Sequence, residues 1–565
     1  MSKKADMQAL MEAFLRHTRE EYEALDPPST DAQAPQTLML PMGDGVKLRT
    51  VIRKPAGEGP FPAILLRSCY PQSEAMLAVD AEAYARRGFA FVYQFCRGTG
   101  GSEGVWEPNV NDRADGKTTA DWLDGLAWVD CIGWLGSSYT AFTGWVVADI
   151  LPDKVKTMYL THYGTDRFVS AYQRGLFRQD VLTAWAMENA GKPVTADYEA
   201  SARYRPQISV DTDVWHTGEL PWYRDWITNT SRTDAYWNTG FWKMLDDIPA
   251  KVKIPVYLGE SWYDHHLGSA LQTWRKLSPA SRRHSTLRIG AWNHMFQPCL
   301  GDHTIEHIEN SNTRTAYEWF DQILKKKQLP QSRVLLYNTG ADLWEQEPAY
   351  PFPEAQTLTL YFSGERDDTR TLAKRVAPQG SASYLYNPDD PVRSSGAESL
   401  LRNMQDNGSL PQPPPDYRAD VLSFLSQPLD RDTTILGRIT AQLFVASDAQ
   451  DTAFTAKVME VLPDGRTRSI RGSITTLAYR GDPDAPRASY TPGQIVRAGI
   501  DMWDVMYTLR RGSRIRVDIS SSDFPQYAVH PNTAGIWSLQ AKARSARQTL
   551  YFGTEYPSAI VIPLK

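Results

Sequence analysis

CIGWLGSSYTAFTGWVVA, at residues 131–148, is the stretch that decides the fold. It combines an apolar strand at 131–135, a sharp turn at 136–140 and the start of a helix at 141–148. This order is the setting in which a serine hydroxyl stands exposed at the top of a parallel sheet, with a backbone N–H behind it. Ser138 is therefore the candidate nucleophile. The match to Gly-x-Ser-x-Gly is imperfect, because Thr140 stands where the last Gly is expected, and a Gly-x-Ser at a helix N-cap is the alternative.

Similar apolar runs recur on both sides of this stretch. They lie at residues 63–66, 89–93, 254–258 and 287–290, and helix-length segments separate them. Runs of this kind predict strands that are buried on both faces of a mostly parallel sheet. The core of the protein is therefore predicted to be α/β.

A serine nucleophile needs a base, and the base needs an acid that holds its tautomer. Asp264 follows the run at 254–258, and His294 follows the run at 287–290. Both residues then lie beyond the carboxyl ends of parallel strands, on the same edge as Ser138, and the chain order Ser, Asp, His is the one expected for this fold. We predict that His294 is the general base and that Asp264 orients it.

Three other histidines are alternatives. His162 follows the strand-like residues 158–160 and could face the same edge. His265 and His266 stand beside Asp264 and could be metal ligands, but no third ligand with zinc-like spacing accompanies them. We therefore predict no metal site and place these two histidines in the wall of a pocket.

The remaining sequence divides the chain into segments. Residues 1–36 predict an N-terminal helical arm, with Leu10, Met11, Phe14 and Leu25 on its apolar face. Residues 37–167 and 248–330 form the predicted catalytic domain, and the Trp-rich segment 168–247 is a helical cap inserted into it. Residues 331–565 alternate apolar and polar side chains and predict a C-terminal β-sandwich of the jelly-roll type. The pocket is expected to use Trp185, Trp222, Trp226 and His265.

Composition excludes several classes of protein. The net charge of -5 offers no basic surface for phosphates, so we expect no nucleic-acid partner. No uninterrupted apolar stretch approaches 18 residues, and no apolar segment follows the charged N-terminus, so we expect no membrane partner and a cytoplasmic location. The four cysteines show no CxxC pairing and are predicted to be reduced thiols.

Several short motifs resemble, in order, those of one family. They are RSCY at 67–70, QFCRGTGGSE at 94–103, GSSY at 136–139, DAYW at 234–237, WYD at 262–264, WNH at 292–294 and SSSDFP at 520–525. The chain is similar over nearly its whole length to the cocaine-esterase and X-prolyl dipeptidyl-peptidase family (CocE/NonD, peptidase S15-like) of serine hydrolases. This family also holds α-amino-acid ester hydrolases and some β-lactam acylases. The resemblance implies an α/β-hydrolase core with a helical cap and a C-terminal jelly-roll domain.

The resemblance also implies an oxyanion hole, in which Tyr70 donates its phenolic O–H and Tyr139 its backbone N–H. Cys69 stands where the family has Pro, and Phe95 where it has Asp. Amino-acid ester hydrolases place acidic residues after the catalytic Asp to hold a substrate ammonium group, and here His265 and His266 occupy those positions. A free α-amino group is therefore not an expected requirement.

We expect acyl transfer in two steps through an acyl-enzyme on Ser138, without a cofactor. The expected partner is a small-molecule ester with a bulky apolar or aromatic acyl part. An amide, an X-prolyl dipeptide and a β-lactam or amino-acid acyl substrate are alternatives within the same chemistry. Non-catalytic binding of a carbohydrate or protein and a metallohydrolase are the alternatives from other classes. A homodimer is an open alternative.

Overall fold

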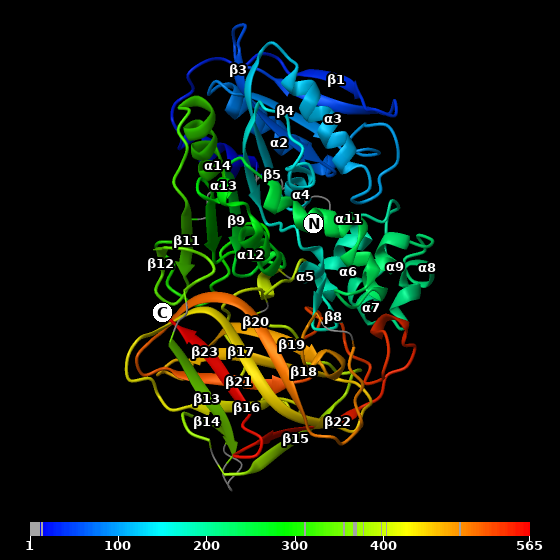
Figure 1. The fold of residues 1–565 in the computed structure, drawn as a ribbon, viewed down its shortest axis with the longest axis vertical. Coiled ribbons are helices and arrows are strands. Elements are labelled where there is room, and N and C mark those ends of the chain that lie inside the picture. Colours follow the sequence, from blue (N-terminus) through cyan, green and yellow to red (C-terminus); the bar gives the residue numbers. More distant parts are fainter. Residues whose placement is uncertain are drawn as a thin grey trace.

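The computed structural model describes residues 12, 15–309, 312–353, 356–364, 370–376, 378–396, 398–402, 404–484 and 487–565. The molecule is elongated, with an α/β domain at one end, an all-β domain at the other and a group of short helices beside the junction (Figure 1). Of the predicted N-terminal helix, Leu10, Met11 and Phe14 lie outside the described residues. Residues 15–23 are helical, and the side chain of Tyr22 is buried.

A ten-stranded sheet forms the centre of the α/β domain. Its order is β1-β2-β4-β3-β5-β6-β9-β10-β11-β12, and the seven strands from β4 to β11 are mutually parallel. The strands are β1 (Gln36–Pro41), β2 (Lys47–Arg53), β3 (Phe61–Ser68), β4 (Ala90–Phe95), β5 (Val129–Ser137), β6 (Val155–Thr161), β9 (Val256–Ser261), β10 (Thr286–Gly290), β11 (Arg333–Asn338) and β12 (Leu343–Glu347).

Helices cover both faces of this sheet, as the continuous apolar runs predict. In β3, Ala63 and Leu65 belong to one hydrophobic cluster, whereas Ile64 and Leu66 belong to another on the opposite face. Because side chains alternate across a strand, both sets must be apolar when both faces are buried. The helices are α2 (Glu74–Ala85), α3 (Asp112–Asp124), α4 (Tyr139–Trp145), α12 (Leu267–Lys276), α13 (Pro279–Arg282) and α14 (Asn312–Phe320). The predicted α/β class is confirmed.

The sheet continues past residue 330, where the end of the catalytic domain is predicted. Strand β11 pairs in parallel with β10, and β12 pairs antiparallel with β11. Strand β12, LWEQE, lies at the edge of the sheet and is mostly polar, unlike the continuous apolar runs of the inner strands. Pattern alone does not separate such an edge strand from a sandwich strand.

Short helices fill the segment between β6 and β9. They are α5 (Arg167–Ala171), α6 (Gln179–Glu188), α7 (Tyr198–Arg203), α8 (Val210–Asp213), α9 (Pro221–Thr228), α10 (Ala235–Asn238) and α11 (Gly240–Asp247), with the two-residue strands β7 (Tyr172–Gln173) and β8 (Leu176–Phe177) after α5. Figure 1 shows these helices beside the carboxyl-terminal edge of the parallel strands. Their buried Trp and Tyr side chains share one hydrophobic cluster with the catalytic domain.

The C-terminal domain is all-β and encloses its own hydrophobic core. Along β17, Ile439, Ala441, Leu443 and Val445 all point into this core, as the alternation predicts. Its strands are β13 (Gln356–Gly364), β14 (Arg370–Ala373), β15 (Gly380–Tyr386), β16 (Leu422–Ser426), β17 (Thr433–Ser447), β18 (Ala453–Val461), β19 (Thr467–Thr476), β20 (Val496–Leu509), β21 (Arg514–Ser520), β22 (Ala546–Phe552) and β23 (Ala559–Leu564).

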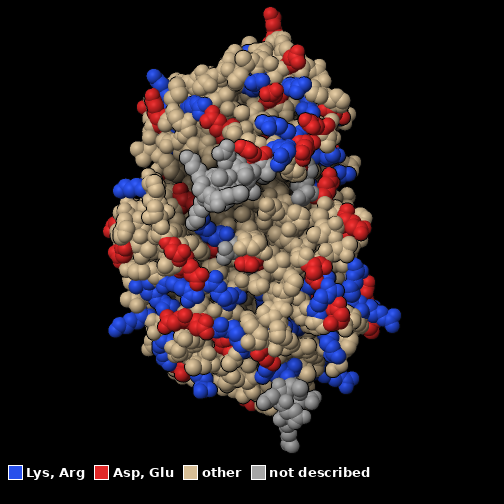
Figure 2. All heavy atoms as spheres, turned by 180° about the vertical axis from the view of Figure 1, so that it is seen from behind, with Lys and Arg blue, Asp and Glu red and all other residues tan. Residues whose placement is uncertain are grey.

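Acidic and basic side chains are interspersed on the face of the molecule shown in Figure 2. In the part of the chain that the structure describes, no helix has the length and apolar character needed to cross a bilayer.

Candidate active site

Ser138 lies at the junction between β5 and α4, in a strained conformation. Its backbone has φ 57° and ψ −130°, a region that costs a non-glycine residue about 1 to 3 kcal/mol. The backbone N–H of Ser138 donates to the carbonyl of Thr161 at the end of β6, at 3.0 Å. A Cβ atom at Gly136 would lie 2.3 Å from the carbonyl oxygen of Thr140, so the turn requires glycine there.

The hydroxyl of Thr140 ties this turn together from within. Its Oγ1 accepts from the N–H of Ser137 and donates to the carbonyl of Ser137, both at 2.7 Å. A glycine at position 140 makes neither contact. The departure from Gly-x-Ser-x-Gly therefore replaces backbone freedom with two hydrogen bonds, and the sharp turn is kept.

The structure brings together Ser138, His294 and Asp264, which are far apart in the sequence. Nε2 of His294 lies 2.9 Å from Oγ of Ser138, and Nδ1 of the same ring is hydrogen-bonded to Oδ2 of Asp264. Each of the three follows the carboxyl end of a parallel strand, namely β5, β10 and β9. With the imidazole proton on Nδ1, Nε2 is free to accept the proton of the serine hydroxyl.

Asp264 is held as a carboxylate beneath the histidine. Burial by itself raises the pKa of Asp264, but the charge of His294 and the hydrogen bond from its ring outweigh burial and hold the pKa of this carboxyl well below its usual range. Its second oxygen, Oδ1, accepts from the backbone N–H of His266 at 2.8 Å and lies 3.7 Å from Nδ1 of His265. Both oxygens are thus engaged, which fixes the orientation of the carboxylate.

Glu260, at the end of β9, is a fully buried second carboxyl group near Asp264. One oxygen accepts from the N–H of Ser261 at 3.0 Å, and the other has no hydrogen-bond partner among the described residues. Burial, reinforced by the charge of Asp264, raises the pKa of Glu260 well above its usual range. The surroundings of Glu260 therefore favour its neutral, protonated form, and sequence patterns miss this residue because it lies within an apolar strand.

His162, the alternative base, lies against His294 with 5.2 Å between ring centres. Its Nε2 accepts from the indole N–H of Trp292 at 3.2 Å, and burial lowers the pKa of His162 to about 4. Among the described residues, His294 and not His162 is hydrogen-bonded to Ser138. His162, Asp264 and His294 form the one group of described residues close enough to share a metal ion, and two of them already pair with each other.

Tyr70 and Tyr139 both line the cavity into which Ser138 opens. The indole N–H of Trp185 donates to the phenolic oxygen of Tyr70 at 3.2 Å, and burial raises the pKa of Tyr70, so the phenol keeps its own proton to donate. The side chain of Tyr139 donates to Asp112 at 2.7 Å. Its backbone N–H is the first of α4, and the first N–H groups of a helix have no partner within the helix.

The cavity encloses about 530 Å³, which suits a small organic molecule. Of the predicted pocket residues, Trp185, Trp226 and His265 line it. Trp222 does not, and instead packs edge to face against the rings of Trp185 and Trp226. The cavity wall also includes residues that the sequence does not single out: Met76, Asn109, Tyr163, Arg167, Val181, Leu182, Leu401 and Met404. Arg167 has a sequence signal, because it follows the end of β6 on the same edge as Ser138.

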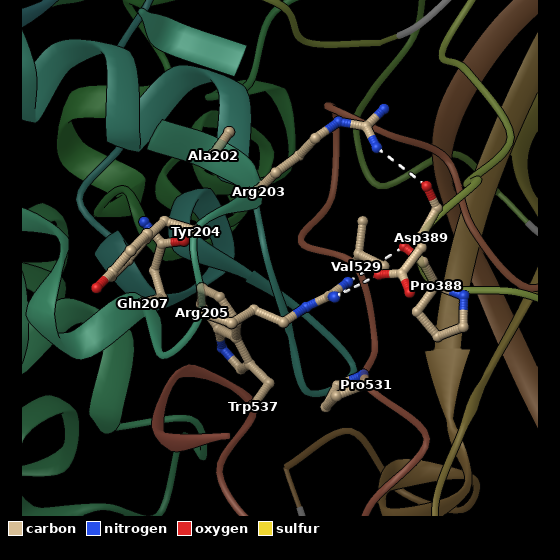
Figure 3. A pocket seen from close by; sticks show the side chains of 10 residues that line it. All are labelled: Ala202, Arg203, Tyr204, Arg205, Gln207, Pro388, Asp389, Val529, Pro531 and Trp537. Carbon is tan, nitrogen blue, oxygen red and sulfur yellow. Dashed lines mark hydrogen bonds and ion pairs between the residues drawn. The ribbon is translucent and has the colours of Figure 1, made fainter. Parts of the chain in front are cut away.

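A second, smaller hollow of about 90 Å³ lies between α7 and loops of the C-terminal domain (Figure 3). The charged side chains that line it are already paired. Arg205 donates to the carboxylate of Asp389 at 2.6 Å, and Arg203 donates to the backbone carbonyl of Asp389 at 3.4 Å. The hollow lies between the cap and the all-β domain, and its described lining residues include neither a serine nor a histidine.

Comparisons with known proteins agree with this geometry. Residues 44–296 match the model of the X-Pro dipeptidyl-peptidase (S15) family, and residues 325–561 match that of the X-Pro dipeptidyl-peptidase C-terminal non-catalytic domain. The chain is 28% identical over 569 residues to a cocaine esterase from Rhodococcus sp. (strain MB1 Bresler). The alignment covers 93% of this chain and 98% of the esterase.

Two solved structures share the fold over most of the chain. An α-amino acid ester hydrolase superposes with a TM-score of 0.80 at 22% identity, covering 96% of this chain and 98% of the other. An aminopeptidase from a marine sediment archaeon, Thaumarchaeota archaeon, superposes with a TM-score of 0.79 at 22% identity. The superposition covers 95% of this chain and 97% of the aminopeptidase. At this identity the likeness establishes the fold.

Proposed function

Because the chain belongs to the cocaine-esterase and X-prolyl dipeptidyl-peptidase family of serine hydrolases, we propose that it hydrolyses a carboxylic ester through an acyl-enzyme on Ser138. The observation that carries the proposal is the hydrogen-bonded series Ser138, His294, Asp264 at the floor of an aromatic cavity. Such a series activates a hydroxyl that is unreactive by itself.

In the first step, Oγ of Ser138 attacks the ester carbonyl and His294 takes its proton at Nε2. Asp264, which is ionised and buried, stabilises the imidazolium that forms. The negative charge that develops on the carbonyl oxygen is accommodated by the phenol of Tyr70 and the backbone N–H of Tyr139. His294 then passes its proton to the departing alcohol. In the second step it activates the water that releases the acid from Ser138.

The residues that line the cavity favour some ester and amide substrates over others. Trp185, Trp226 and Leu182 offer flat apolar surfaces, which favour a bulky apolar or aromatic acyl group. An N-terminal dipeptide or an α-amino ester brings an ammonium group that needs an acidic partner. Glu188 is the one carboxylate among the described lining residues, and Arg402 pairs with it at 3.5 Å. An ester without a free amino group therefore fits this cavity better.

The test is covalent labelling of the full-length protein with a fluorophosphonate, followed by intact mass, alongside turnover of p-nitrophenyl esters of graded acyl size. We expect one adduct on the native protein, none on Ser138→Ala, and a loss of turnover of about 10⁴-fold or more in that variant. Ser137→Ala is the matched control, since Ser137 is the adjacent serine and its hydroxyl takes no part in the series. An adduct that persists in Ser138→Ala, or native protein that neither reacts nor turns over esters, contradicts the proposal.

A further inference from the structure

Arg167 is a buried cation in the wall of the active-site cavity. It is the first residue of α5, which follows β6 at the edge of the sheet that carries Ser138. Only 9% of its surface is exposed, and it lines the same cavity as Ser138 and His294. Its guanidinium carbon lies 4.7 Å from the ring centre of Trp226, which supports one side of the planar group.

The guanidinium of Arg167 has no anionic partner among the described residues. The seven other buried arginines each donate at least one hydrogen bond to a carbonyl, hydroxyl or carboxylate. Arg516, for example, donates to Asp518 at 2.7 Å. For Arg167, neither a hydrogen bond nor an ion pair to any residue of the described ranges is formed. Because arginine stays protonated in proteins, a guanidinium that lines a cavity, is largely buried and has no anionic partner favours the binding of an anion there.

No other group on the described cavity wall competes for this role or neutralises the charge. Glu188 pairs with Arg402, which lies outside the set of lining residues. The rings of His265 and His266 are neutral, because burial lowers the pKa of both groups well below its usual range. Arg167 is thus the fixed positive charge of the described wall, and it is set among apolar and aromatic side chains.

We propose that the substrate is an ester or amide that carries a carboxylate on an apolar body, and that Arg167 binds this carboxylate while Ser138 attacks the carbonyl. The inference rests on the proposed function and names its substrate class. A guanidinium suits the task, since its donors match the two oxygens of a carboxylate. The same charge repels a substrate ammonium group, so the cavity is selective for the opposite polarity to that of an amino-acid ester.

The experiment compares two esters that differ only in charge: the mono-p-nitrophenyl ester of glutaric acid and its methyl ester. The native protein should have the higher kcat/KM for the acid. Arg167→Met should lower kcat/KM for the acid by about 10²-fold, as the loss of a buried charge partner does. The methyl ester should change less than about threefold, and Arg167→Lys should keep part of the preference because it keeps the charge.

Arg497→Met is the matched control, because Arg497 lies outside the cavity wall and donates to the side chain of Gln442, so its loss removes one positive charge without freeing a carboxylate of the described residues. It should leave the ratio of the two esters unchanged. If it lowers the ratio as much as Arg167→Met does, the preference comes from the overall field of the protein and the proposal is overturned. Equal losses on both esters in Arg167→Met also overturn it, since they place Arg167 in the reaction itself or in the fold.

A second measurement needs no variant. Glutarate should inhibit turnover of the methyl ester by the native protein competitively, and at least about tenfold more tightly than the neutral glutaramide. Equal inhibition overturns the proposal. These outcomes separate the role of Arg167 from the esterase function. A native protein that hydrolyses the methyl ester without preferring the acid refutes only the role of Arg167. A protein that hydrolyses neither ester and resists the fluorophosphonate refutes the esterase function as well.

Discussion

Asp264→Asn tests how the buried carboxylate controls His294. In the native protein, Oδ2 of Asp264 accepts from Nδ1 of His294, and Oδ1 accepts from the N–H of His266 at 2.8 Å. An asparagine keeps the second bond with its carbonyl oxygen, which turns its NH₂ group toward Nδ1. Because this group only donates, Nδ1 must become the acceptor and the imidazole proton moves to Nε2. His294 then presents a proton to Ser138 where it should present a lone pair.

The expected loss in kcat is about 10⁴-fold, or about 5.5 kcal/mol in the activation free energy. The change is isosteric, so the fold should be kept. The loss should not add to that of Ser138→Ala, because the two residues act on the same proton transfer. The double variant should therefore be no slower than Ser138→Ala alone.

The assay is steady-state turnover of a p-nitrophenyl ester, together with the second-order rate of fluorophosphonate labelling. Circular dichroism of each variant is the control for folding. Turnover by Asp264→Asn within about tenfold of the native rate would refute the reasoning, since it would show that the tautomer of His294 is set elsewhere. Losses that add in the double variant would separate Asp264 from the proton transfer.

Two further predictions concern the neighbours of this series. Tyr70→Phe removes one proposed oxyanion donor and leaves the indole N–H of Trp185 without its acceptor. The kcat for ester hydrolysis should therefore fall about 10²- to 10³-fold, with little change in KM. A change below threefold in ester turnover would exclude this role. Glu260→Gln tests the buried acid. Because the pKa of Glu260 is higher in the folded protein than in the unfolded chain, protonated Glu260 contributes to the free energy of unfolding. This contribution is fully present below the pKa of the unfolded chain and is lost as the pH rises through the pKa of the folded protein. The variant, neutral at every pH, should therefore gain on the native protein between pH 5 and pH 8, by about 2 °C or more in apparent Tm, and a difference that is the same at both pH values would contradict this.

The α/β core was predictable because its sequence signal is local. Residues 63–66 are apolar without interruption, and they must be, since alternate side chains enter hydrophobic clusters on opposite faces of the sheet. Ser138, Asp264 and His294 were predictable for a related reason. Each directly follows such a run, and parallel strands bring their carboxyl ends to one edge.

Edge strands and pocket walls were less predictable. β12 (Leu343–Glu347) belongs to the first sheet although it lacks the continuous apolar run of the inner strands. In α9, Trp226 lines the cavity whereas Trp222, one turn earlier, packs behind it. Both positions favour burial, and only the packing of α6 against α9 decides which ring meets the cavity.

The sequence by itself thus determined the class of the core, the order of its strands along the chain and the three residues that follow their ends, because periodicity and position along a strand carry that information. Only the tertiary structure decided the charges around them. Whether Glu260 is neutral, whether His162 or His294 meets Ser138 and whether Arg167 finds a partner all depend on side chains from distant segments. Electrostatic interactions act over a few ångströms in space, and distance along the chain does not set that separation.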